Sequence, residues 1–108
     1  AFGSDAPVEP FDPFKGIHAA VTRQRDGQPE GGWFPEARLT LDEALHGFTG
    51  GAAYAAGMED RLGKLAVGYL ADCIVIDRDP YAIAPDDWLT LDVLATIVGG
   101  RVRYGDIG

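Results

Sequence analysis

The spacing of apolar residues predicts a helix near the start of the chain. Phe14, Ile17 and Val21 lie on one face at helical spacing, with His18 on the same stripe. Asp12-Pro13 precedes this stripe and is suited to the N-cap and first helical position, where the missing proline N–H costs no hydrogen bond. Gly27 follows two arginines that favour the helix dipole, so we expect the helix to stop there.

A second helix is predicted from the capping box that begins at Thr40. Thr40 is expected to accept from the amide of Glu43, whose carboxylate reaches back to the Thr40 amide. The apolar face that follows consists of Leu41, Ala44, Leu45 and Phe48. Gly47, Gly50 and Gly51 interrupt the same helix, and each costs about 1 kcal/mol relative to alanine in an exposed helix interior. We therefore expect close packing against another backbone to compensate.

Residues 26–38 lie between these helices and show no sustained hydrophobic period. They contain three glycines and two prolines around Trp33 and Phe34. We expect a loop that the two aromatic side chains pin in place.

The pattern changes to that of β-structure after Gly57. The apolar run Cys73–Ile76 is bounded by two aspartates, which is typical of a short strand covered on both faces. Val93–Val98 predicts a second strand. Gly99-Gly100 can adopt positive φ at both positions and precedes alternating polar and apolar residues at 101–104, which predicts a β-hairpin. The intervening polar segment has Tyr81, Ile83 and Trp88 as apolar anchors.

Composition limits the possible size, location and partners of the protein. A chain of 108 residues fits one small domain, and its 15 glycines and seven prolines predict short elements and much loop. A net charge of −8 argues against binding to nucleic acid or to an anionic membrane. No run reaches the roughly 20 apolar residues of a membrane span, and a cytoplasmic location is expected. The chain begins with Ala rather than Met, so the question of an upstream targeting segment stays open.

Asp5 is the sharpest candidate for chemistry. A carboxylate that follows Gly-Ser near the end of an apolar strand can serve as a metal ligand or general base, but from these residues alone an aspartate that caps a turn is the favoured explanation. His18 is better explained by packing, and His46 by a surface pair with Asp42 one turn earlier. Ser4 has no local histidine to activate it. Spacing therefore gives no complete metal or nucleophilic site.

Two further features have structural explanations. The glycines at 63 and 68 lack the Lys-Ser/Thr pair of a phosphate loop and are expected to form a turn. Cys73 is the single cysteine, which excludes an internal disulfide and suggests a buried thiol acting as a small hydrophobe.

Several motifs occur in the order of one enzyme family. They are Gly3-Ser4-Asp5-Ala6-Pro7, Asp12-Pro13-Phe14, Ala19-Ala20-Val21-Thr22-Arg23, Trp33-Phe34-Pro35-Glu36 and segments 39–45, 71–80 and 96–104. Together they make the whole chain resemble the C-terminal end of a metal-dependent amidohydrolase, in the branch that includes N-substituted formamide deformylases. The sequence departs from the family pattern at Val67, where proline is usual, and at Tyr69, where lysine is usual.

The resemblance implies an α+β chain with two parts. Residues 1–57 would be the end of a (β/α)8 barrel with one or two helices, and residues 58–108 a small sheet or hairpin of the accessory β-sandwich. Asp5 matches the aspartate after barrel strand eight, which in the family binds a divalent metal, commonly zinc. The same aspartate takes a proton from the hydrolytic water and delivers it to the leaving nitrogen. The family's other metal ligands would lie upstream of this chain.

The resemblance favours a function in hydrolysis of C–N bonds other than peptide bonds, with a small amide-type substrate and a metal-activated water in the intact enzyme. We expect the chain alone to be inactive and to bind no metal. The alternative is a non-catalytic module that self-associates or binds a partner through unpaired strand edges at Cys73–Ile76 and Val93–Val98. A small acidic structural protein unrelated to the family is a third hypothesis.

Overall fold

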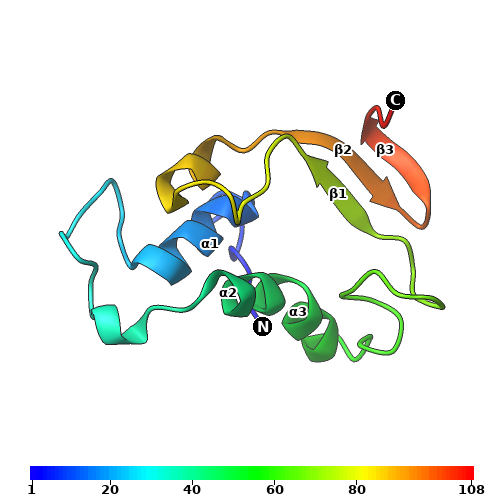
Figure 1. The fold of residues 1–108 in the computed structure, drawn as a ribbon. Coiled ribbons are helices and arrows are strands. Elements are labelled where there is room, and N and C mark those ends of the chain that lie inside the picture. Colours follow the sequence, from blue (N-terminus) through cyan, green and yellow to red (C-terminus); the bar gives the residue numbers. More distant parts are fainter.

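The computed structural model describes residues 1–108 and shows an α+β chain with helices at one end and a small sheet at the other (Figure 1). The helices are α1 (Pro13–Thr22), α2 (Leu41–Phe48) and α3 (Gly50–Ala55), with short 3₁₀ helices η1 (Pro35–Ala37) and η2 (Pro85–Thr90). The strands are β1 (Cys73–Ile76), β2 (Val93–Val98) and β3 (Arg101–Gly105). None of the helices is long and apolar enough to cross a membrane.

Helix α1 begins as the sequence predicts but ends earlier. Asp12 is the N-cap, and its Oδ1 accepts from the Phe14 amide at 2.9 Å. The expected stop at Gly27 is wrong, because the helix ends at Thr22 and Arg23 adopts the left-handed conformation with φ 55°. The Thr22 hydroxyl donates to the His18 carbonyl and accepts from the Gln24 amide, which satisfies backbone groups at the helix end.

The capping box of α2 is confirmed, but the single long helix is not. The Thr40 amide donates to Glu43 Oε2 at 2.8 Å, and the Glu43 amide donates to Thr40 Oγ1 at 3.2 Å. The chain breaks at Thr49, with φ −117° and ψ −89°, and restarts as α3. Close backbone packing does occur next to the break, because a β-carbon on Gly63 would lie 2.8 Å from the Gly50 Cα.

The aromatic pair in residues 26–38 does not pin the loop, contrary to expectation. Trp33 and Phe34 pack edge-to-face with ring centroids 5.2 Å apart, and both side chains stay exposed. The loop is instead held through its backbone, because the Trp33 amide donates to the Arg23 carbonyl at 2.8 Å. Arg23 Nε donates in return to the Trp33 carbonyl at 3.0 Å.

The three strands form an antiparallel sheet in the order β1-β2-β3. The predicted hairpin is confirmed, with φ 58° at Gly99 and 74° at Gly100. An unpaired edge on β2 was a wrong expectation, because β2 is central and the free edges belong to β1 and β3.

One face of the sheet is uncovered, whereas the sequence predicts a strand at Cys73–Ile76 that is covered on both faces. Thr96 pairs with Ile74 on one side and Tyr104 on the other, so these residues share a face with Val98. We call this the open face: its apolar members Ile74, Val98 and Tyr104 are 45%, 45% and 63% exposed. The helices lie at the opposite end of the molecule, so no second layer of this chain packs on the open face (Figure 1).

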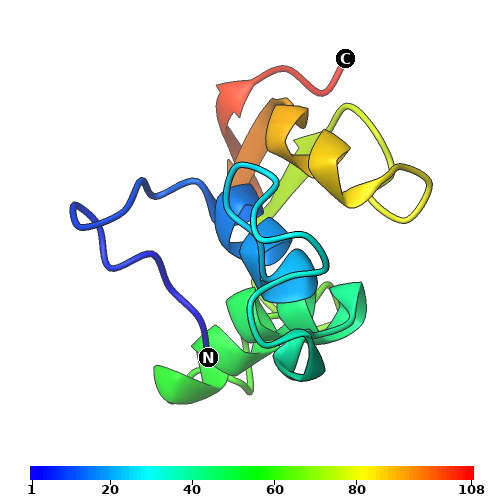
Figure 2. The same ribbon diagram turned by 90° about the vertical axis from the view of Figure 1, so that its left-hand side faces the viewer.

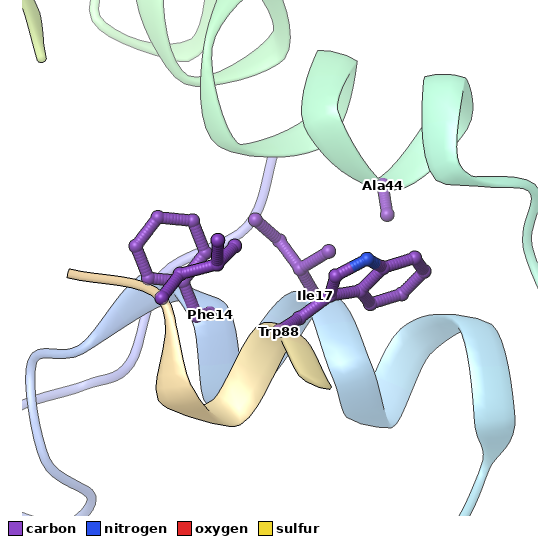
Figure 3. Packing of buried hydrophobic residues seen from close by; sticks show 5 residues of the cluster. Phe14, Ile17, Ala44 and Trp88 are labelled. Carbon is purple, nitrogen blue, oxygen red and sulfur yellow. The ribbon is translucent and has the colours of Figure 1, made fainter. Parts of the chain in front are cut away.

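The small core lies between α1, α2 and η2 (Figure 3). It consists of Phe14, Ile17, Ala44, Trp88 and Leu91. Residues 77–92 therefore leave the sheet, contribute two side chains to the helical core and return. Of the three expected anchors Trp88 is buried and Ile83 packs against the core, whereas Tyr81 is exposed and donates its hydroxyl to Asp42.

Candidate functional site

The segment that carries Asp5 starts from a fixed point on α2. The Phe2 amide donates to the Gly47 carbonyl at 2.8 Å, and the Phe2 ring packs edge-on against Phe48 with centroids 5.6 Å apart. The ring fits because Gly47 has no side chain, since a β-carbon there would overlap it. Residues 1–5 form no strand within this chain, which contains no neighbouring strand for them to pair with.

Asp5 is exposed and lies in a turn just beyond this fixed point. Its φ of 53° is left-handed, a conformation that aspartate tolerates better than most residues, and its carbonyl accepts from the Val8 amide at 2.9 Å. The Asp5 carboxylate makes no hydrogen bond or ion pair with another residue. It is therefore free to contact a ligand or a proton donor.

The other candidates do not join Asp5 in a cluster. His18 is 4% exposed and its Nε2 lies 2.8 Å from Asp86 Oδ1, which confirms the packing role and adds a partner 68 residues away. His46 is exposed, but the expected pair with Asp42 is wrong because Asp42 accepts from the Tyr81 hydroxyl. No histidine contacts Ser4, so nothing in the chain activates its hydroxyl.

The chain does not assemble a metal site from its own residues. It contains no group of three or more histidine, cysteine, aspartate or glutamate side chains placed to hold an ion. A catalytic zinc needs about three protein ligands, and Asp5 supplies one carboxylate. Cys73 is a half-buried free thiol in β1, somewhat more accessible than the sequence suggests.

A cavity of about 580 Å³ lies between the Asp5 loop and the helices. Gly3 and Ser4 line it on the loop side, and residues of α1 such as Gly16 and His18 line it on the helix side. Figure 2 shows the loop bowing away from α1 before it enters the helix. Glu9 and Arg25 also line the cavity, and their side chains meet at 3.5 Å. Sequence spacing gave no signal for this pair.

The pKa shifts in the molecule belong to the segment 77–92. The backbone amide of Asp92 lowers the pKa of Asp77 by donating to its carboxylate, with help from Arg78 and against a smaller effect of burial. The hydrogen bond to Asp42 raises the pKa of Tyr81 above its usual value. Asp77 joins the two ends of the segment and Tyr81 connects the segment to α2, so these shifts reflect structural contacts.

Comparison with known families decides the relationship. The family model described as the amidohydrolase family matches residues 1–104. This chain belongs to the amidohydrolase family. The match covers α1 to α3 and almost all of the sheet of this amidohydrolase-family chain, with Asp5 inside it.

Individual relatives agree with the family match. YtcJ of Bacillus subtilis (strain 168), named as an amidohydrolase, is 39% identical over 105 residues, covering 96% of this chain and 20% of that protein. The N-substituted formamide deformylase of Arthrobacter pascens is 34% identical over 109 residues, covering 100% of this chain and 20% of that protein. The imidazolonepropionase of Kosmotoga olearia is 29% identical over 94 residues, covering 87% of this chain and 20% of that protein.

The amidohydrolase-family chain spans about a fifth of the length of these relatives. No solved structure matches it. Family membership is thus shown, and the reaction of the whole protein is a matter for proposal.

Proposed function

We propose that this chain is the C-terminal part of a hydrolase that acts on C–N bonds other than peptide bonds. The observation that carries the proposal is the family match through residues 1–104, in a chain about a fifth as long as its relatives. One of these relatives is named for deformylation of N-substituted formamides and another as an imidazolonepropionase. A small molecule with an amide-type C–N bond is the substrate class we propose.

In this proposal the two ends of the molecule have different places in the intact enzyme. Residues 1–57 would complete a (β/α)8 barrel, and residues 58–108 would contribute to a β-sandwich beside it. The separation of helices and sheet supports this division (Figure 1), and so does the open face of the sheet, which a second layer would cover. The hydrophobic core, to which both parts contribute side chains, would join them.

Asp5 is the residue we propose for proton transfer. Its exposed, unpaired carboxylate would take a proton from the attacking water and deliver it to the leaving nitrogen. A divalent metal, with zinc as our proposal, would supply Lewis-acid activation of that water when bound in the intact enzyme. The residues of this chain do not form such a site alone, so the remaining ligands would come from outside it and the chain alone would be inactive.

Substitution of Asp5 in the intact natural protein tests the proposal. Hydrolysis of N-substituted formamides and cyclic amides would be measured for the wild type and for Asp5→Asn, which we expect to lower kcat by about 10²–10⁴-fold. Asp26→Asn is the matched control, because Asp26 is also exposed and left-handed, with φ 52°. Full activity in Asp5→Asn would refute the role of Asp5, and turnover by residues 1–108 alone with added zinc would refute their inactivity.

The open face favours a second candidate function. If the chain exists as a free protein, the open face and the free edge of β3 would favour association with a second copy. This module would be non-catalytic. The mass of the native protein in its source separates the candidates, because a polypeptide several times heavier than 11.5 kDa supports the hydrolase.

A further inference from the structure

The loop that carries Asp5 is weakly attached to the rest of the molecule. Between the anchor at Phe2 and the N-cap at Asp12, residues 3–11 make one backbone hydrogen bond, from the Val8 amide to the Asp5 carbonyl, and it lies within the loop. The largest apolar side chains of the loop do not pack, since Val8 is 77% exposed and Phe11 is 87% exposed. Neither backbone pairing nor apolar burial therefore fixes the middle of the loop.

One ion pair joins the loop to the body of the protein. Arg25 Nη2 lies 3.5 Å from Glu9 Oε1, and no other hydrogen bond or ion pair connects residues 3–11 to residues outside the loop. Arg25 is itself held, because its amide and carbonyl both pair with Gln28 just beyond the end of α1. Both residues of the pair line the cavity that lies between the loop and α1.

We infer that Glu9 and Arg25 are positioning residues for Asp5. Their ion pair sets how far the loop stands from α1, and the turn at Asp5 moves with the loop. This inference rests on the proposed role of Asp5 in proton transfer. Without the pair, the carboxylate would sample more orientations, and fewer of them would suit proton transfer because that step requires hydrogen-bond distances.

Loss of the Glu9–Arg25 ion pair is expected to have a small but measurable effect. Both side chains are more than half exposed, and pairs of this kind typically contribute about 0–1 kcal/mol, which corresponds to at most about a fivefold change. The effect should also weaken as ionic strength rises, since exposed pairs are screened by salt. Large losses of activity would indicate a different role.

A charge-reversal cycle in the intact natural protein tests the inference. The variants are Glu9→Arg, Arg25→Glu and the double variant with both changes, in which the pair is re-formed with opposite polarity. Hydrogen exchange of the Val8 amide, whose acceptor is Asp5, reports the loop directly and needs no substrate. We expect each single variant to speed exchange about two- to fivefold and the double variant to restore the wild-type rate. Glu30→Arg is the matched control, because Glu30 is exposed in the neighbouring loop and has no ion-pair partner.

Measurement of turnover distinguishes a positioning role of the Glu9–Arg25 pair from a purely structural contact. For a substrate that the wild type hydrolyses, kcat should fall about two- to fivefold in each single variant with KM retained, and recover in the double variant. Unchanged exchange in both single variants would overturn the inference, and would indicate that other parts of the protein hold the loop. Faster exchange with unchanged kcat would overturn the positioning role. A wild type that hydrolyses no substrate would count against the proposed function, while the exchange rates would still decide whether the pair holds the loop.

Discussion

The two tryptophans of this chain have contrasting environments that give a test at the scale of single residues. Trp88 is 4% exposed in the core and its indole N–H donates to the Pro80 carbonyl at 2.8 Å, whereas Trp33 is 62% exposed. Trp88→Ala should lower the free energy of unfolding by about 3–5 kcal/mol, because it leaves a cavity and an unpaired carbonyl. Trp33→Ala should change it by less than about 0.5 kcal/mol. Urea unfolding followed by circular dichroism measures both, and equal effects would show that Trp88 is not the core residue.

Individual residues also show which parts of the candidate site could be predicted from the sequence. Asp12 and Thr40 were predictable as caps because their partners lie two or three residues away. The partner of His18 was not predictable, because Asp86 is 68 residues distant and has no local pattern that marks it. Asp5 was singled out by the Gly-Ser that precedes it, and its proposed role in proton transfer came from a resemblance to a family. Under the proposed function, the remaining metal ligands would lie outside residues 1–108 and could not be predicted from them.

At the scale of elements, Asp77 joins the two ends of the segment 77–92. Its Oδ1 accepts from the Asp92 amide at 2.9 Å, which is the main cause of its lowered pKa, and its Oδ2 accepts from Arg78. A lowered folded pKa means that the folded state binds the proton more weakly than the unfolded state. The contribution of Asp77 to stability is therefore complete above its ordinary pKa of 3.8 and is lost as the pH falls through the lowered value.

Substitution of Asp77 should flatten this part of the pH dependence. Between about pH 5 and pH 2 the free energy of unfolding should fall less steeply in Asp77→Asn than in the wild type. Asp87→Asn is the control, because the Asp87 side chain is exposed and makes no hydrogen bond or ion pair. Chemical unfolding at a series of pH values measures the slopes. Identical slopes in Asp77→Asn and the wild type would contradict the assignment.

The pairing of β2 with β3 depends on a glycine at the far end of the hairpin. Gly105 has φ 71°, and a β-carbon there would overlap the carbonyl oxygen of Leu94 in β2. Gly99 in the turn has φ 58°, but a β-carbon there would meet nothing within 4 Å. The two positions therefore share the left-handed backbone and differ in steric conflict.

We expect Gly105→Ala to destabilise the sheet more than Gly99→Ala. Gly99→Ala should cost about 1–2 kcal/mol for the left-handed conformation alone. Gly105→Ala adds a backbone shift in β2 and should increase hydrogen exchange of the amides that pair β2 with β3. Equal losses in urea unfolding would show that the overlap relaxes without effect.

The elements themselves follow from local sequence to different degrees. The hairpin was predictable because Gly99-Gly100 sets positive φ at two adjacent positions. The central place of β2 was not, since it depends on pairing with β1, which lies on the far side of segment 77–92. The glycines near residue 50 indicate an interrupted helix but do not place the break at Thr49. The strand Cys73–Ile76 shows the limit most clearly. Its apolar run correctly predicts a strand, but Ile74 and Val75 in the middle of the strand stay exposed because no second layer of this chain covers them.

At the scale of the whole molecule, the open face gives the last prediction. A three-stranded sheet with an exposed apolar face and a free β3 edge should associate when residues 1–108 are studied alone. Sedimentation velocity over a range of concentrations would detect this. Tyr104→Lys, which places a charge on the open face beside the free β3 edge, should weaken association about tenfold.

Charge makes the choice of Tyr104→Lys informative. The chain carries a net charge of −8, so an added lysine reduces repulsion between copies and would by itself favour association. Weaker association in Tyr104→Lys can therefore be attributed to the loss of the apolar contact. Tyr54→Lys is the control, because Tyr54 is similarly exposed but lies on α3, away from the sheet. A wild type that stays monomeric at all concentrations, or an equal weakening by Tyr54→Lys, would show that the open face does not drive association.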